Sequence, residues 1–125
     1  MWDIKERPLR TPIDVFIPRG GKTVINTRLA FDFGHKHWGF VCDKSSIALN
    51  HGLTFGGRII DCGYRGELKL IAINLNPKQD ISIKRGSKIC QVLIQKRTFF
   101  HLEETKFENF STTERGFNCF GSTGQ

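Results

Sequence analysis

An acidic residue follows an apolar run near the middle of the chain. Two isoleucines lead to Asp61, and Tyr64 comes three residues later, after a glycine. A carboxylate at the mouth of such a turn can orient or deprotonate a water molecule. The ring of Tyr64 can stack on a sugar or a base. An ordinary turn aspartate is the alternative for Asp61, so the choice depends on what other segments contribute.

Two other segments carry groups that suit an anion. One cation and two hydroxyls stand at the start of a predicted helix (residues 45–50): Lys44, Ser45 and Ser46. The end of the chain combines a guanidinium, an aromatic ring, glycines and hydroxyls: Arg115, Phe120, Gly121, Ser122 and Thr123. Free amides at a helix start, and backbone amides beside glycine, add donors for phosphate oxygens. A surface helix capped by its serines and a disordered tail are the alternatives.

The elements that must position these groups are predicted to be short strands. Eight runs show alternating or compact apolar residues: 13–17, 23–27, 29–33, 38–42, 59–62, 67–75, 81–84 and 88–94. Turns rich in glycine, proline and asparagine separate them, and no strand–helix–strand spacing is visible. The sequence therefore predicts an all-β domain, built as an antiparallel sandwich, barrel or jelly roll.

Length and composition fit a single domain over residues 1–125, with an N-terminal segment (1–12) and a mobile C-terminal arm (111–125). A net charge of +7 favours an anionic partner. The longest apolar run has four residues, whereas a membrane span needs about 20. Since no signal-peptide pattern is visible either, we expect no membrane insertion and no secretion. The expected location is the cytoplasm or the nucleus, or the interior of an infected cell if the protein is encoded by a virus.

The last 27 residues differ from the rest, because they hold six of the eleven phenylalanines but little alternation. Such a segment cannot bury itself on its own sheet, so we expect it to pack on another surface or on a ligand. Core packing of Phe99, Phe100 and Phe107 is the alternative.

Four cysteines lie 20, 28 and 29 residues apart, without the close pair that zinc or a redox couple needs. We predict reduced thiols, most of which behave as small buried hydrophobes.

Taken together, these segments resemble the motifs of the dUTP pyrophosphatases (dUTPases) in order and spacing. Residues 61–67 (Asp-Cys-Gly-Tyr-Arg-Gly-Glu) resemble motif 3, and 44–46 (Lys-Ser-Ser) resemble motif 2. Residues 86–91 (Gly-Ser-Lys-Ile-Cys-Gln) are similar to motif 4, and Arg115 with 120–124 is similar to motif 5. The Lys-Ser-Ser form looks most like retroviral members, which suggests a viral origin.

The resemblance implies a jelly-roll or distorted β-barrel subunit with one short helix and an extended C-terminal arm. It also implies a homotrimer in which each site takes motifs from all three chains. Asp61 would hold the water that attacks the α-phosphorus of dUTP, releasing dUMP and pyrophosphate. Mg²⁺, bound mainly through the triphosphate, would screen charge and hold its geometry. Neither a membrane nor a specific nucleic acid is an expected partner.

The family's binding roles can be carried over to matching positions. Tyr64 would pack on deoxyribose, and the backbone of a hairpin that includes Gly57 and Ile60 would read the uracil edge. Phe120 would stack over uracil when the tail closes. The phosphate chain would be bound by hydroxyl, amide and cationic groups: Lys44, Ser45, Ser46, Gln91, Arg115, Gly121, Ser122 and Thr123.

The chain departs from the family pattern at several positions. The motif 1 acid has no good copy; Asp3 is the nearest candidate and would act on the metal through water. Arg58 stands where family hairpins usually have glycine, so its side chain either crowds the uracil pocket or points away. Residues 117–119 replace glycines of the tail, which should stiffen it. Arg28 also occupies a position where glycine is common.

Three other functions remain as alternatives. A dUTPase-like protein that binds nucleotide or regulates a partner but has lost catalysis would fit the missing motif 1 acid. A dCTP deaminase is disfavoured, because Ile71 occupies the register of the deaminating glutamate. Nucleic-acid binding through the basic surface is disfavoured too, because lysines and arginines are scattered along the chain.

Overall fold

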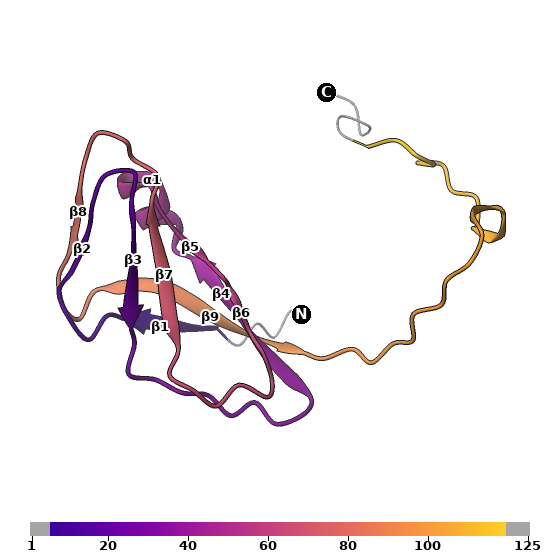
Figure 1. Cartoon of the computed structure of the whole chain (residues 1–125), viewed down its shortest axis with the longest axis horizontal. Helices are drawn as coiled ribbons and strands as arrows, with labels where there is room; N and C mark the ends of the chain where they lie inside the picture. Colours follow the sequence, from indigo (N-terminus) through magenta and orange to yellow (C-terminus); the bar gives the residue numbers. More distant parts are fainter. Residues whose placement is uncertain (1–5, 120–125) are drawn as a thin grey trace.

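The computed structural model describes residues 6–119. These residues form a body of strands, from which the end of the chain leaves as an extended arm (Figure 1). One four-stranded sheet has the order β1-β9-β4-β6, and all its pairs are antiparallel. Its strands are β1 (Glu6–Arg10), β9 (Lys88–Lys96), β4 (His37–Asp43) and β6 (Ile59–Ile60).

A three-stranded sheet and a two-stranded ribbon complete the body. The sheet has the order β3-β7-β5, and β2 pairs with β8 in the ribbon, again all antiparallel. The strands are β3 (Lys22–Asn26), β7 (Lys69–Asn74), β5 (Leu53–Gly56), β2 (Val15–Ile17) and β8 (Ile81–Ile83). The structure thereby confirms the predicted all-β class.

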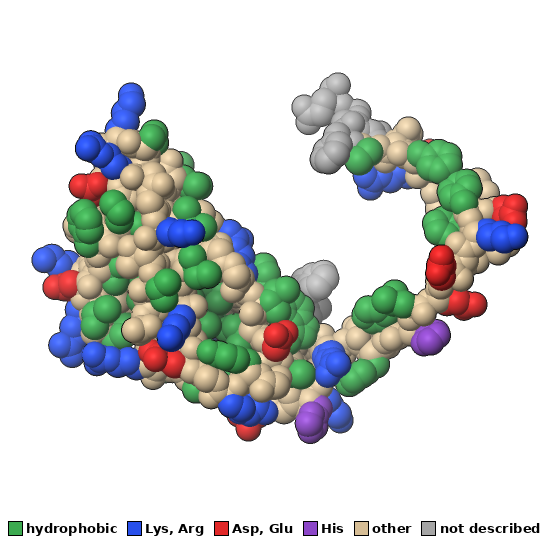
Figure 2. All heavy atoms as spheres, viewed as in Figure 1, with side chains coloured by type: hydrophobic (Ala, Val, Ile, Leu, Met, Phe, Trp, Pro, Cys, Tyr) green, Lys and Arg blue, Asp and Glu red, His purple; other side chains and the backbone are tan. Residues whose placement is uncertain are grey.

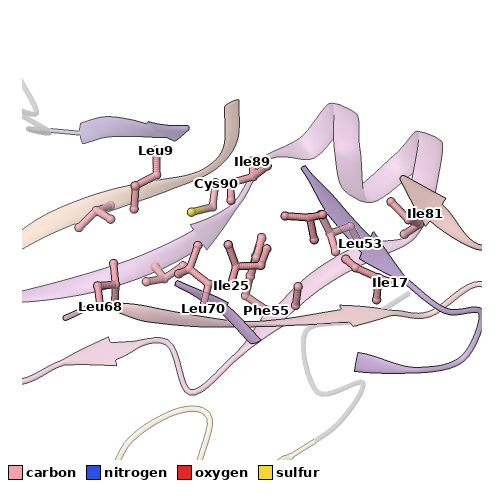
Figure 3. Packing of buried hydrophobic residues seen from close by; sticks show 14 of the residues in the cluster. Leu9, Ile17, Ile25, Leu53, Phe55, Leu68, Leu70, Ile81, Ile89 and Cys90 are labelled. Atoms are coloured by element: carbon pink, nitrogen blue, oxygen red, sulfur yellow. The ribbon is translucent and has the colours of Figure 1, made fainter. Parts of the chain in front are cut away.

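The hydrophobic core lies between these sheets (Figure 3). Along β7, Leu70 and Ala72 point inward while Ile71 between them is exposed, as the strand period of two requires. Ile25 of β3, which pairs with Leu70, and Ile89 of β9 belong to the same core cluster and are fully buried. Burial of one such side chain contributes about 1.5 to 3 kcal/mol to folding.

The strand predicted for residues 29–33 is wrong. Arg28 has a φ of 60°, which turns the backbone out of β3 before this run begins. Leu29 accepts one backbone hydrogen bond from Leu68, but no strand pairs with the run. Phe31 and Phe33 stack on each other and pack against the core, which accounts for the apolar pattern without a sheet.

Two strands were missed by the sequence. β1 lies inside the segment 1–12, and its sequence Glu-Arg-Pro-Leu-Arg offers only one buried apolar side chain, that of Leu9. β5 has four residues and ends at a glycine. β1 pairs with the longer strand β9, and β5 pairs with the longer strand β7. The hydrogen bonds to these neighbours, more than the local sequence pattern, therefore make them strands.

The predicted helix is α1 (Ser45–His51), which ends at Gly52 in the left-handed conformation with φ 70°. The expectation that its serines cap the free amides is wrong, because the N-cap residue is Lys44 and makes no side-chain cap. The ammonium of Lys44 instead donates a 2.9 Å hydrogen bond to Oγ of Ser46. Within residues 6–119, no helix is long and apolar enough to span a membrane.

In the structure the arm begins at residue 98, and its described residues, 98–119, are all exposed. Phe99, Phe100 and Phe107 are 69%, 75% and 63% exposed, so the alternative that packed them in the core is wrong for the isolated chain. Apart from a short 3-10 turn, η1 (Phe107–Asn109), the arm has no regular structure. Figure 2 shows hydrophobic side chains spaced along it, facing solvent. A surface outside this chain is needed to bury them.

Candidate active site

The acid turn (residues 61–66) begins where β6 ends. The backbone N–H of Tyr64 donates to the carbonyl of Asp61 at 3.1 Å, which closes a β-turn. Arg65 braces the turn, because its Nη1 donates to the carbonyls of Cys62 (2.7 Å) and Tyr64 (3.1 Å). Its Nη2 also forms a 2.9 Å ion pair with Asp32. The turn thus has a defined shape although it is exposed.

Asp61 presents its carboxylate to solvent from this turn. None of residues 6–119 donates a hydrogen bond to the carboxylate oxygens. They are therefore available as acceptors for a water molecule.

The ring of Tyr64 is held over the end of the acid turn. Its hydroxyl donates a 2.8 Å hydrogen bond to the carbonyl of Glu67. A Cβ atom at Gly66 would lie 2.6 Å from that hydroxyl oxygen, so the ring occupies space that only glycine leaves open. Tyr64 is nevertheless 45% exposed, which leaves part of the ring for a ligand.

Asp61 and Tyr64 line a common pocket of about 190 Å³. The other lining residues come from the connection before β6, from β6 itself and from the chain around the first residue of β7: Gly57, Ile59, Ile60, Leu68 and Lys69. The Ile60 side chain is 4% exposed and belongs to the core, so mainly its backbone is available to a ligand. Typical small-molecule sites have about 300 to 1,000 Å³, so this pocket fits part of a nucleotide.

The family resemblance had implied a hairpin before Asp61. The structure shows no such hairpin, because β5 and β6 do not pair with each other. β5 pairs with β7 in one sheet, whereas β6 pairs with β4 in the other. Gly57 and Arg58 therefore form a crossing between two sheets. Gly57 has a φ of 59°, which glycine adopts without strain.

The serine segment (residues 44–46) lies at the opposite end of β4. Cys42 pairs with Gln91 in the β4–β9 register, two residues before the serine segment begins. The structure therefore brings Gln91 close to Lys44 and Ser45, as expected of groups that bind one anion.

Cys90, beside Gln91 on β9, is fully buried, and this burial raises the pKa of its thiol to about 12. It is a neutral hydrophobe, as predicted. Cys42 and Cys62 are partly exposed and Cys119 is exposed, so the expectation that most of the cysteines are buried is wrong. No disulfide joins the four.

The two groups of residues are separated along β4. Ile60, next to Asp61, pairs with Gly39, whereas Gln91 pairs with Cys42. Three residues of a strand span about 10 Å. The pocket at Asp61 includes neither the serine segment nor Gln91. Within one chain the two groups therefore lie toward opposite ends of β4.

The remaining site predictions concern the chain ends. Arg115 lies in the arm, where its Nε donates to the carbonyl of Asn118 at 3.0 Å. The other predicted residues lie outside the described residues: Asp3, Phe120, Gly121, Ser122 and Thr123.

Arg58 points away from the pocket and does not line it. It forms a 3.1 Å ion pair with Asp43, the last residue of β4. Of the two outcomes considered for this position, crowding of the pocket is therefore wrong. Sequence reasoning did not connect Arg58 with Asp43, and only the opposite charges 15 residues apart could have signalled the pair.

Comparisons with known proteins agree with this geometry. The family model for dUTPase matches residues 8–124. The deoxyuridine 5'-triphosphate nucleotidohydrolase of Candida albicans is 34% identical over 109 residues, which cover 87% of this chain and 68% of that protein. The enzyme of the same name from Corynebacterium diphtheriae is 38% identical over 112 residues, covering 88% and 72%.

The solved structure of native EIAV dUTPase superposes with a TM-score of 0.74 at 30% identity and covers 86% of this chain and 93% of that one. This match confirms the dUTPase-type fold that the motifs had implied. The chain belongs to the dUTPase family.

Proposed function

We propose that this protein hydrolyses dUTP to dUMP and pyrophosphate. The observation that carries the proposal is the convergence of Asp61, Tyr64 and the crossing at Gly57 on one pocket. The family match and the relatives named as deoxyuridine triphosphate nucleotidohydrolases support the same reaction.

The pocket would hold the uracil and the sugar. Its volume of about 190 Å³ suits this part of a nucleotide, and the backbone between Gly57 and Ile60 offers both donors and acceptors to a base edge. The half-exposed ring of Tyr64 would pack on deoxyribose and leave no space for a 2'-hydroxyl. Selection of uracil and of deoxyribose would thus come from one turn and one crossing.

Asp61 would act on the water. Its carboxylate would orient the water and accept its proton as the new oxygen–phosphorus bond forms at the α-phosphorus. The bond from that phosphorus to the bridging oxygen breaks, and pyrophosphate leaves with the electron pair. Positioning of the water is the main requirement, because phosphoryl transfer needs little covalent participation by the protein.

The triphosphate would be bound by a second protein subunit. Lys44, Ser45, Ser46 and Gln91 offer a cation, hydroxyls and an amide at the far end of β4. Their distance from Asp61 along the strand supports a homotrimer in which these groups complete a neighbour's site. The exposed arm, with Arg115 and the glycine-serine-threonine cluster beyond it, would reach a further chain and close over the substrate, Phe120 stacking on uracil.

The residues fit a Mg²⁺ ion that is held by the substrate. Within residues 6–119, no group of three or more histidine, cysteine, aspartate or glutamate side chains could hold a metal. Mg²⁺ commonly keeps several waters and binds phosphates with one or two carboxylates, which needs no such cluster. When bound, the ion neutralises charge on the phosphates. Asp3 would contact its waters.

Turnover of dUTP in the presence of Mg²⁺, compared with dCTP, dTTP and UTP, tests the proposal. We expect pyrophosphate from dUTP at least about 100-fold faster than from the other three, since the pocket selects base and sugar together. Asp61→Asn should lose at least about 100-fold in kcat while dUTP affinity is largely retained. Binding of dUTP without turnover by the unchanged protein would contradict the enzymatic proposal. Ammonia release from dCTP would point to a deaminase instead.

A further inference from the structure

Arg58 is the centre of a hydrogen-bonded clamp beside the crossing between β5 and β6. Its Nη2 contacts Asp43 Oδ2 at 3.1 Å and Thr54 Oγ1 at 2.8 Å. Its Nε donates to the carbonyl of Phe55 at 2.8 Å. The guanidinium thus binds three acceptors, two of them on β5 and one at the end of β4.

Asp43 closes the clamp from the other side. Its Oδ2 accepts from Thr54 Oγ1 at 2.7 Å, and its Oδ1 accepts from the backbone N–H of Phe55 at 3.2 Å. The peptide groups of Phe55 are therefore held at the N–H by Asp43 and at the carbonyl by Arg58. The side chains of Asp43 and Arg58 are only 25% and 36% exposed, so water screens these contacts partly.

The clamp fixes the point at which the chain leaves one sheet for the other. The backbone carbonyl of Arg58 accepts from Val41 of β4 at 2.8 Å, so this residue is held by both backbone and side chain. Gly57, next to it, lines the pocket and has little conformational restraint of its own. Without the guanidinium, the bond from Val41 would remain but the contacts to Asp43, Thr54 and Phe55 would be lost, so the backbone at Gly57 could shift relative to Asp61.

We infer that Arg58, held by Asp43 and Thr54, is a positioning residue that sets the pocket backbone of residues 57–60 for the base. This inference rests on the proposed function, because it assigns base recognition to that backbone. Arg58 does not line the pocket and acts only through the crossing. Base contacts of this kind are made in the ground state and the transition state alike, so their loss raises KM and leaves kcat nearly unchanged.

Arg58→Ala tests the inference, with Arg85→Ala as the matched control. Arg85, like Arg58, is next to a glycine in a connection between two strands, but it is exposed and lies between β8 and β9. We expect Arg58→Ala to raise the KM for dUTP about tenfold, because misplacement by about 1 Å can cost up to about 100-fold. Its kcat should stay within about threefold of the original value. The KM of Arg58→Lys should be intermediate, because lysine keeps the positive charge but lacks the planar set of N–H donors of the guanidinium.

Two fragments separate a positioning effect from general loss of structure. Inhibition by 2'-deoxyuridine, which has the base and sugar alone, should weaken about tenfold in Arg58→Ala. Inhibition by tripolyphosphate, which has no base, should stay unchanged. Equal weakening of both, together with a lower thermal midpoint, would show a structural role and overturn the inference.

The outcome is distinguishable from a failure of the proposed function. If the unchanged protein does not turn over dUTP, the proposed function fails. If it does, and Arg58→Ala has the same KM as Arg85→Ala, the inference about Arg58 fails alone.

Discussion

The two ends of β4 carry different chemistry. At one end the serine segment and Gln91 present a cation, hydroxyls and an amide, all suited to phosphate oxygens. At the other end the acid turn presents a carboxylate and an aromatic ring beside a small pocket. Neither end holds a complete set for nucleotide hydrolysis. Within one chain the two sets of groups therefore lie apart, and the proposed function brings them together by placing two chains at one site.

Mixing two variants, each disabled at one end of β4, has the largest expected effect and tests whether the two ends act together across chains. Asp61→Asn disables the acid turn, and Lys44→Ala with Ser45→Ala disables the serine segment; each alone should retain below about 1% of activity. Chains of the two kinds, expressed together, should recover about a quarter of the original turnover, because random assembly pairs an intact turn with an intact segment in that fraction of shared sites.

A chain that carries all three substitutions is the control for this mixture. It should remain inactive at any concentration, since it supplies neither half. If the mixed preparation shows no more than the activities of its two parents added together, each site is built within one chain and the shared-site proposal is wrong.

Removing the end of the arm tests whether catalysis needs the arm in addition to the acid turn and the serine segment. Deletion of residues 111–125 should lower dUTP turnover about 100-fold, because it removes Arg115 and the donors that follow it. The thermal midpoint should change by less than about 3 °C, because every described residue of this segment is exposed. A large fall in the midpoint would mean that the arm is part of the folded body.

The sequence predicted the long strands better than the connections between them. Alternating runs such as β7 bury every second residue and can be recognised locally. The crossing at Gly57 could not be predicted, because it depends on β5 and β6 joining different sheets. Asp61 and Tyr64 were identified from their spacing, but the separation of Asp61 from Gln91 required the register of β4 with two other strands.

The failures share one physical cause, which is tertiary context. The run 29–33 has a strand-like pattern, yet Arg28 turns the chain and leaves no partner for it. The serines of α1 favour capping, yet Lys44 reaches Ser46 instead. The arm is rich in phenylalanine like a core segment, yet its described residues are exposed, because the body of the chain does not cover them.

Substitution at Gly66 would sharpen the role of the acid turn. In Gly66→Ala the new methyl group would lie 2.6 Å from the Tyr64 hydroxyl oxygen, so the ring must move and lose its bond to Glu67. We expect kcat/KM for dUTP to fall about tenfold and discrimination against UTP to weaken. Gly63→Ala is the matched control, because a Cβ atom there has nothing within 4 Å. Equal kinetics for both variants would exclude a role of the ring in binding.

The smallest expected effect concerns strain behind the acid turn. Arg28, with φ 60°, donates its backbone N–H to Glu67 Oε1 at 2.9 Å, and Glu67 in turn accepts from Tyr64. Arg28→Gly keeps that donor and removes the left-handed strain, so the free energy of unfolding should rise by about 0.5 to 1 kcal/mol. The thermal midpoint should then rise by about 2 to 5 °C. Arg28→Ala retains the Cβ atom and should show no gain; a lower midpoint for Arg28→Gly would mean that the arginine side chain itself stabilises the connection that follows β3.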